Sequence, residues 1–175
     1  MYHYCKEYAF TLVELLISIS ILGIIATLAF PTYLNFKAKQ EMNQITSLIQ
    51  MLNQTAKSNA VIYHSNIIIC SSSNSTRCAD NQWGNSMIMF SDRNNNQQID
   101  SDEMIHTVID TKLKYGSLNW SGGTSSTKVL TFQGDTGLPR GSPGSFRYCS
   151  QHSSSLHRRI VLPRTGLIRF EDLSC

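Results

Sequence analysis

Charged residues are scarce in this 175-residue sequence: Asp, Glu, Lys and Arg together make up 15% of it, and the formal net charge is only +3. A chain this weakly basic has no overall charge that would favour a nucleic-acid partner. Hydrophobic residues make up 41% of the sequence, which is too much for a disordered chain. Length and composition therefore predict one folded domain joined to an apolar N-terminal segment.

Recognisable catalytic motifs are also missing. The sequence has no nucleophile elbow, metalloprotease helix or phosphate-binding loop. Serines are abundant, but many lie in low-complexity stretches such as residues 71–76 and 121–127, and His64 and His106 each stand alone. We therefore expect neither an enzyme nor a bound cofactor.

The longest apolar run covers residues 10–30 and carries no charge except Glu14. As an α-helix it would span about 30 Å, the hydrocarbon thickness of a membrane. The small residue Ala9 precedes this run, whereas a secretory signal peptide has its small residues after the apolar core. Cleavage after Ala9 would remove a short polar leader and keep the membrane helix. A carboxylate costs about 2.5–3.5 kcal/mol at the centre of a membrane helix, so Glu14 needs a specific role.

A second pattern follows Pro31, which would kink a helix without necessarily ending it. Apolar residues then recur every third or fourth position, with polar residues on the other face. These apolar positions are Leu34, Ala38, Met42, Ile45, Ile49, Leu52 and Ala56. One long helix over residues 10–62 is therefore predicted, apolar all round in its first half and amphipathic in its second.

Beyond Tyr63 the sequence changes to short runs of β-branched and aromatic residues separated by Ser, Asn and Gly. Such runs are typical of strands joined by turns. The predicted strands are 67–70, 86–90, 104–110, 113–119, 128–132, 145–149, 159–162 and 167–170. A helix lying on one antiparallel sheet, an α+β fold, is the simplest architecture for this order.

Five cysteines are present, and Cys5 lies in the polar leader. The other four form an even set, which in an exported domain favours disulfides with three possible connectivities. We expect Cys70 to pair with Cys78 in a local loop, and Cys149 to pair with Cys175 so that the C-terminus is tied down.

Two stretches have some features of metal sites, but no metal is expected at either. Cys149, His152, His157 and Cys175 match no standard zinc spacing. Residues 92–103 have oxygen-bearing side chains at the spacing of an EF-hand loop, but Gln97 stands where that loop needs glycine and the flanks read as strands. A solvated turn explains this stretch without an ion. Its weak calcium candidates are Asp92, Asn94, Asn96, Asp100 and Glu103.

The segment "AFTLVELLISISILGIIATLAFP" (residues 9–31) resembles the N-terminal signature of type IV pilins and type II secretion pseudopilins. In that family prepilin peptidase cleaves before the phenylalanine, here Phe10, which is then N-methylated. The glutamate, here Glu14, pairs with the amino terminus of a neighbouring subunit, and a partner ammonium makes a carboxylate tolerable in lipid. Ala9 departs from the family, which nearly always has glycine at this position.

The resemblance extends over nearly the whole chain, to the FimT/FimU minor pilins and the related H-type pseudopilin. It is carried by "CSSSNSTRCADNQWGNSMIMFSDRNNNQQIDSDEMI", "LTFQGDTG", "GSFRYC" and "RRIVLPRTGLIRF". It implies a leader over residues 1–9, a transmembrane and assembly helix over 10–31, and a periplasmic head over 32–175.

The function implied by this resemblance is that of a minor pilin in a type IV pilus, acting in filament initiation or assembly with effects on adhesion, twitching motility or competence. Its implied partners are major and minor pilins, prepilin peptidase and the inner membrane. The chain would cross the inner membrane once before assembly and then join the filament, with the tip as one position. A type II secretion pseudopilin is the alternative within the same fold.

Basic residues are concentrated near the C-terminus: the sequence from Gly137 on contains six arginines and only two acidic residues. Pilins of the FimT kind that are linked to DNA uptake carry a G-R-x-R motif, to which Gly166 and Arg169 correspond here, with Leu167 in place of the first arginine. The stretch "PRTG" predicts a hairpin that would gather the arginines at one end of the head. Double-stranded DNA is therefore one candidate ligand, and a solvated edge or pilin contact is the other interpretation. The candidate residues are Arg158, Arg159, Arg164, Gly166 and Arg169.

Overall fold

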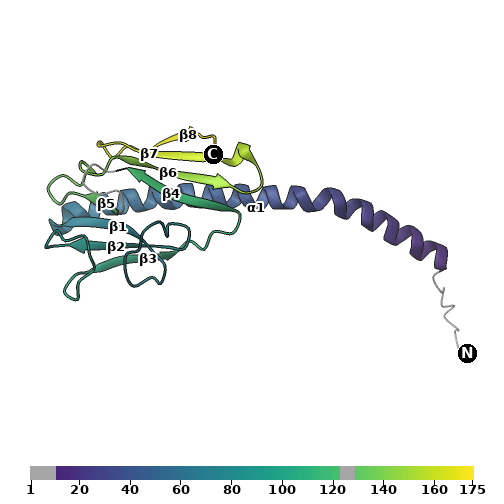
Figure 1. Ribbon diagram of the computed structural model, residues 1–175, viewed down its shortest axis with the longest axis horizontal. Coiled ribbons are helices and arrows are strands. Elements are labelled where there is room, and N and C mark those ends of the chain that lie inside the picture. The colour runs from purple at the N-terminus through teal and green to yellow at the C-terminus, as the bar shows by residue number, and fades with distance from the viewer. Residues whose placement is uncertain (1–10, 123–128) are drawn as a thin grey trace, which may run out of the picture.

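The computed structural model describes residues 11–122 and 129–175, so the predicted cleavage site at Ala9 and Phe10 lies outside the described residues. One long helix, α1 (Leu12–Tyr63), is followed by eight strands and one 3-10 turn in the described part of the chain (Figure 1). The strands are β1 (Asn66–Ser72), β2 (Ser86–Asp92), β3 (Ile105–Asp110), β4 (Gly116–Gly122), β5 (Val129–Phe132), β6 (Gly144–Ser150), β7 (Arg158–Leu162) and β8 (Arg169–Asp172), with η1 (Ser154–Leu156) before β7.

Helix α1 runs without interruption through Pro31 for 52 residues. Its first half projects away from the head, and its second half lies along the two sheets (Figure 1). The amphipathic stripe predicted from the sequence faces the head, since Ala38 and Ala56 are completely buried. The helix ends at Tyr63, and its C-cap residue His64 has a left-handed backbone (φ 48°). The predicted long helix is thus confirmed within the described residues.

The eight strands form two antiparallel four-stranded sheets with the orders β3-β2-β1-β5 and β4-β6-β7-β8. The α+β class is confirmed, but the single sheet predicted from the sequence is wrong. The physical reason is the amount of apolar surface to be covered: strands of both sheets, such as β1 through Ile69 and β6 through Phe146, contribute buried side chains to one core with α1. Every predicted strand is present, although β4 begins three residues later than expected and β8 two residues later.

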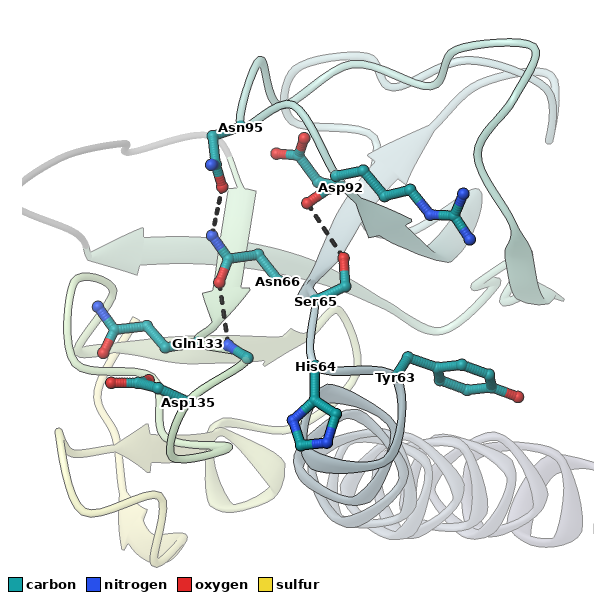
Figure 2. A pocket seen from close by; sticks show the side chains of 10 residues that line it. Tyr63, His64, Ser65, Asn66, Asp92, Asn95, Gln133 and Asp135 are labelled. Atoms are coloured by element: carbon teal, nitrogen blue, oxygen red, sulfur yellow. Dashed lines mark hydrogen bonds between the residues drawn. The ribbon is translucent and has the colours of Figure 1, made fainter.

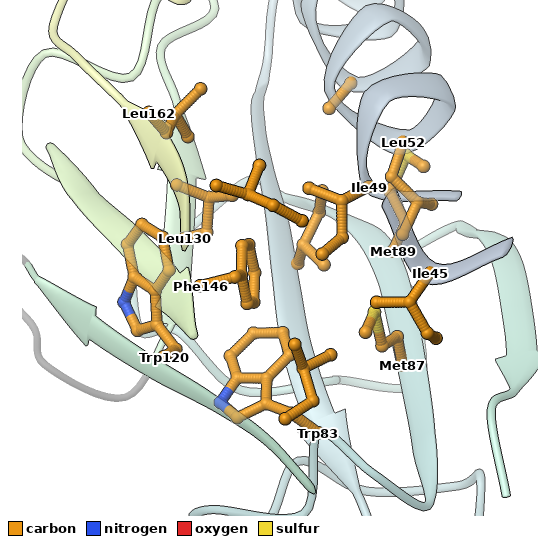
Figure 3. Close-up of a cluster of buried hydrophobic side chains, with 14 of the residues drawn as sticks. Ile45, Ile49, Leu52, Trp83, Met87, Met89, Trp120, Leu130, Phe146 and Leu162 are labelled. Carbon is orange, nitrogen blue, oxygen red and sulfur yellow. The ribbon is translucent and has the colours of Figure 1, made fainter. Parts of the chain in front are cut away.

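One core is enclosed by α1 and the inner faces of the two sheets (Figure 3). Three aromatic residues lie at its centre: the ring of Phe146 lies 5.0 Å from that of Trp83, edge-on, and 4.6 Å from that of Trp120. Aromatic pairs at these distances add to the hydrophobic burial. Ile49 and Leu52 of α1 complete the core from the helix side.

Two disulfides join the pairs expected from the sequence. Cys70 on β1 is bonded to Cys78, which closes a loop over a small apolar cluster on the outer face of the first sheet. Cys149 on β6 is bonded to Cys175, the last residue of the chain. The second bond connects the interior of a sheet with the segment that follows its edge strand, β8.

Candidate assembly and binding surfaces

The N-terminus of α1 is closed by a reciprocal cap between Thr11 and Glu14. The Glu14 carboxylate accepts hydrogen bonds from the Thr11 backbone N–H (2.9 Å) and hydroxyl (3.0 Å), and the Thr11 hydroxyl accepts one from the Glu14 backbone N–H (3.3 Å). This Thr-x-x-Glu capping box satisfies N–H groups that a helix start leaves unpaired. Sequence reasoning singled out Glu14 and missed Thr11, although the spacing is a known signature. In the monomer, therefore, the carboxylate is held by its own helix.

The first half of α1 exposes its apolar side chains. Leu12 is 73% exposed, and Leu22 and Ile24 are each more than 60% exposed. Among the described residues this helix is the one long and apolar enough to cross a membrane. A large apolar surface without a partner marks a membrane or protein contact, so this half of the helix is an interaction surface.

A carboxylate on α1 anchors the β3–β4 loop to the helix. Glu41 accepts hydrogen bonds from the backbone N–H groups of Lys114 (2.7 Å) and Tyr115 (3.1 Å) and from the hydroxyl of Tyr148 (2.9 Å). Burial, followed by the hydrogen bond and charge of Glu41, raises the pKa of Tyr148 above its ordinary value. The loop is thereby fixed beside the helix, at the end of the head nearest the projecting half of α1 (Figure 1).

Replacing this carboxylate should destabilise the head. Glu41→Gln keeps the shape but replaces one acceptor oxygen by a donor, which should lower the free energy of unfolding by about 1–3 kcal/mol. The free energy of unfolding should also depend on pH through Tyr148, whose pKa is higher in the folded state than in the unfolded chain. The stabilisation from its protonated hydroxyl is complete below the ordinary pKa of 10.0 and is lost as the pH rises above it. Urea unfolding followed by tryptophan fluorescence measures the difference, with exposed Asp102→Asn as control. Equal stability of the Glu41 and Asp102 variants would contradict the anchoring role.

The C-terminal arginines lie together in a different combination from the one predicted. Alternation along β7 places Arg159 on the outer face of the second sheet, where it lies opposite Arg147 of β6 and Glu171 of β8. Arg169, opposite Val161, lies on the same face. Arg147 was not among the predicted residues, because its place beside Arg159 follows from strand register and not from sequence proximity. Arg147, Arg159 and Arg169 therefore share one exposed sheet face, the arginine face.

The other predicted residues do not join this face. Arg158 lies on the same side of β7 as the buried Ile160, and its Nε atom is buried without a hydrogen-bond partner. Arg164 lies in the turn before β8, which is closed by a bond from the Gly166 N–H to the Pro163 carbonyl (2.9 Å). The predicted hairpin is present, but the period of two in its strands separates the arginines.

Gly166 has a structural role at this turn. Its φ of +68° is left-handed, which favours glycine. Its carbonyl accepts hydrogen bonds from Asn53 Nδ2 (3.2 Å) and Lys57 Nζ (3.4 Å), both on α1. The glycine of the predicted motif therefore pins the β7–β8 turn to the helix.

Arg159 is partly neutralised on the arginine face. Its Nη1 lies 3.6 Å from Oε2 of Glu171, with both side chains nearly half exposed. Its Nε donates to Ser145 Oγ (3.1 Å). These contacts orient the Arg159 guanidinium along the face, and an exposed pair of this kind contributes little to stability.

The EF-hand-like loop is closed by its own hydrogen bonds. The buried carboxylate of Asp92 accepts from the backbone N–H groups of Asn96 (3.2 Å) and Gln97 (3.0 Å). Asp100 accepts from the side-chain amides of Asn94 (2.8 Å) and Asn96 (2.7 Å). The Glu103 carboxylate accepts from the backbone N–H groups of Arg93 and Asp100. In the described ranges no three His, Cys, Asp or Glu side chains form a metal-ligating group. The loop is therefore closed by hydrogen bonds of its own carboxylates to backbone and side-chain amides.

A polar hollow of about 780 Å³ lies beside this loop, at the C-terminal end of α1. Figure 2 shows that Asn66 connects its two sides, donating to Asn95 Oδ1 and accepting from the Gly134 N–H, while the Ser65 hydroxyl donates to the Asp92 carbonyl. These bonds connect the helix end, β1 and two loops at this corner of the head.

A long N-terminal helix with an exposed apolar half and a disulfide-bonded β head is the architecture of a pilin-like protein. Comparison with protein families gives two matches: residues 43–166 match the type II transport protein GspH family, and residues 5–30 match the prokaryotic N-terminal methylation motif. The GspH match covers most of the chain, which therefore belongs to that family. The motif implies processing by prepilin peptidase and assembly with other pilins, which are structural proteins and not enzymes.

One solved structure supports the same fold. The type IV minor pilin FimU of Pseudomonas aeruginosa PAO1, in space group P21, is similar with a TM-score of 0.52 and 17% identity over 78% of this chain and 92% of FimU. Its P65 crystal form gives a TM-score of 0.45 and 17% identity over 77% and 90% of the two chains. No curated protein matches this chain. Family and fold thus confirm the resemblance to the FimT/FimU kind of pilin.

Proposed function

We propose that this protein is a minor pilin that takes part in initiating or assembling a type IV pilus. The observation that supports this most strongly is the membrane-length apolar half of α1, which carries the capped Glu14 and is fused to a GspH-type head. Before assembly the apolar half is covered by lipid, and in a filament the helices of other pilins replace that lipid. The head then works by association with other pilins, with no chemistry of its own.

Deletion of the gene tests this proposal against the type II secretion alternative within the same family. Loss of surface pili with normal secretion of exoproteins is the expected result, and restoration by the wild-type chain is the control. Loss of exoprotein secretion with normal pili would instead assign the chain to a secretion pseudofilament.

A second candidate function, binding of double-stranded DNA, is supported by the arginine face. Arg147, Arg159 and Arg169 project from three neighbouring strands, while Glu171 supplies one opposing charge. Guanidinium groups bind phosphate oxygens through paired hydrogen bonds and read no base sequence in doing so. The expected binding is therefore weak, independent of sequence and strongly salt-dependent.

The DNA candidate predicts a change in salt dependence when the face is neutralised. Each phosphate contact contributes a slope of about 0.9 in log affinity against log salt. Arg147→Gln/Arg169→Gln should therefore reduce the slope by about 1.8, measured by titrating detergent-solubilised mature chain with labelled duplex. Arg77→Gln/Arg93→Gln, which removes two arginines of the other sheet's loops, is the matched control. Equal slopes for the two double variants would contradict DNA binding by this face. If DNA is the ligand, Leu167→Arg should strengthen binding.

A further inference from the structure

A recess of about 330 Å³ lies where α1 enters the head, between the helix and the β3–β4 loop. Lys37, Gln40 and Gln44 line it from the helix, and Lys112 and Lys114 line it from the loop. All five side chains carry hydrogen-bond donors, and three of them carry positive charge. The recess therefore has the chemistry of a site for an anionic, oxygen-rich group.

The acidic residues near this recess are already engaged. The Glu41 carboxylate, which also lines it, accepts hydrogen bonds from the backbone N–H groups of Lys114 and Tyr115. Asp110 lies 2.6 Å from Lys112 Nζ and offsets part of that charge. Lys114 remains exposed, and Lys37 lies near the ring of Tyr33. Three lysines and two carboxylates therefore leave a net positive charge around the recess.

The position of the recess along α1 places it near the membrane surface. Lys37 follows Phe30, the end of the apolar run, by seven residues, which is about 10 Å along a helix. The headgroup layer on each side of a bilayer is about 5–7 Å thick, and charges act over a further 8 Å or so at physiological salt. Figure 1 shows the β3–β4 connection at the end of the head nearest the projecting helix.

Aromatic side chains mark the same level of the helix. Phe30, Tyr33 and Phe36 are 66%, 55% and 56% exposed. The Nζ atom of Lys37 lies 5.7 Å from the centre of the Tyr33 ring. Exposed aromatic residues beside lysines are typical of the membrane–water interface, where rings lie among the headgroups and lysine amines reach the phosphates.

We propose that this recess binds the phosphate-containing headgroup of an anionic phospholipid in the outer leaflet of the membrane that anchors the chain. Lys37, Lys112 and Lys114 neutralise the phosphate, and Gln40 and Gln44 donate hydrogen bonds to its oxygens. The proposal rests on the membrane anchoring of the unassembled pilin. Its consequence is that the head is held against the bilayer until assembly, when neighbouring helices replace the lipid.

Lysine acetylation in proteoliposomes tests this directly. Mature full-length chain is reconstituted in vesicles of phosphatidylcholine, or of phosphatidylcholine with phosphatidylglycerol, treated with an amine-acetylating reagent and analysed by mass spectrometry. Lys37, Lys112 and Lys114 should react about fivefold more slowly in the anionic vesicles. Lys57, twenty residues further along α1, is the internal reference and should react equally in both. Protection should disappear in about 1 M salt, where the Debye length is about 3 Å.

A charge variant distinguishes the recess from general attraction to the surface. Lys112→Gln/Lys114→Gln should remove most of the protection of Lys37, whereas the matched Lys57→Gln variant should keep it. Equal reactivity of Lys37 in both kinds of vesicle, or protection of Lys37 that persists in the double variant, would overturn the proposal. The proposal would also be overturned if inorganic phosphate, added to the chain in detergent, slowed acetylation of these lysines as much as the anionic vesicles do, since the site would then take a soluble anion. Flotation with the vesicles checks insertion separately, so a failure of membrane anchoring is recognised as such.

Discussion

Glu14→Ala is expected to leave the chain in the membrane but to reduce its recovery in sheared filaments about a hundredfold or more. The apolar run gains hydrophobicity from the substitution, so insertion is not impaired. We propose that in the filament this carboxylate pairs with a neighbour's terminal ammonium, a contact that the substitution would remove. Removing one partner of a buried ion pair costs about 3–5 kcal/mol. Quantitative immunoblotting of membranes and of sheared pili measures the two fractions.

A Thr11 variant distinguishes the proposed filament contact of Glu14 from its role in capping its own helix. Thr11→Ala removes the hydroxyl that Glu14 contacts but keeps the carboxylate, so its effect should be limited to the loss of a helix cap, about 1 kcal/mol. Ser20→Ala, which removes a hydroxyl bonded to the Leu16 carbonyl in the same segment, is the matched control. Normal incorporation of Glu14→Ala into filaments would contradict the proposed pairing.

Removal of the C-terminal disulfide should have the next largest effect. Cys149→Ala/Cys175→Ala opens a link between residues 26 apart, which the chain-entropy model values at about 3.5 kcal/mol of unfolding free energy. The edge strand β8 should be affected first, because all four of its residues are exposed and, among the described strands, β7 is its one neighbour in the sheet. Urea unfolding followed by the fluorescence of the buried Trp83 and Trp120 measures the total loss, and hydrogen exchange of residues 169–172 measures the local one.

The second disulfide supplies a comparison for this prediction. Cys70 and Cys78 are only eight residues apart, so opening their loop should cost about 2.5 kcal/mol in the same model. Its removal should leave hydrogen exchange in β8 unchanged. A Cys149/Cys175 variant with wild-type stability and wild-type protection of β8 would show that this bond does not hold the C-terminal strand.

The elements of the fold were predictable from the sequence because each is encoded locally. The apolar stripe from Leu34 to Ala56 has the period of a helix, and the β-branched runs have the composition of strands. The pairing of strands is not local: β1 pairs with β5, more than fifty residues away, across three intervening strands. Alternation shows that a strand has a buried face but not which strand lies beside it. The division into two sheets therefore could not be predicted.

The candidate surfaces differ in the same way. Glu14 stands out because a lone carboxylate in an apolar run is costly, and Gly166 stands out through its motif. The side-by-side placement of Arg147 and Arg159 depends on the register of β6 and β7. The lysine recess depends on a contact between Glu41 and a loop 73 residues away. Such long-range juxtapositions have no signature in a single sequence, so these residues emerge from the structure alone.

The N-terminus of the mature protein tests the pilin assignment most directly. Membranes from cells that express the chain would be extracted, and the purified protein analysed by N-terminal sequencing and intact mass. We predict a chain that begins at Phe10, carries an N-methyl group and has lost the nine-residue leader, as the methylation motif over residues 5–30 implies. A mature chain that begins at Met1, or near residue 30 after removal of the whole apolar run, would contradict the account.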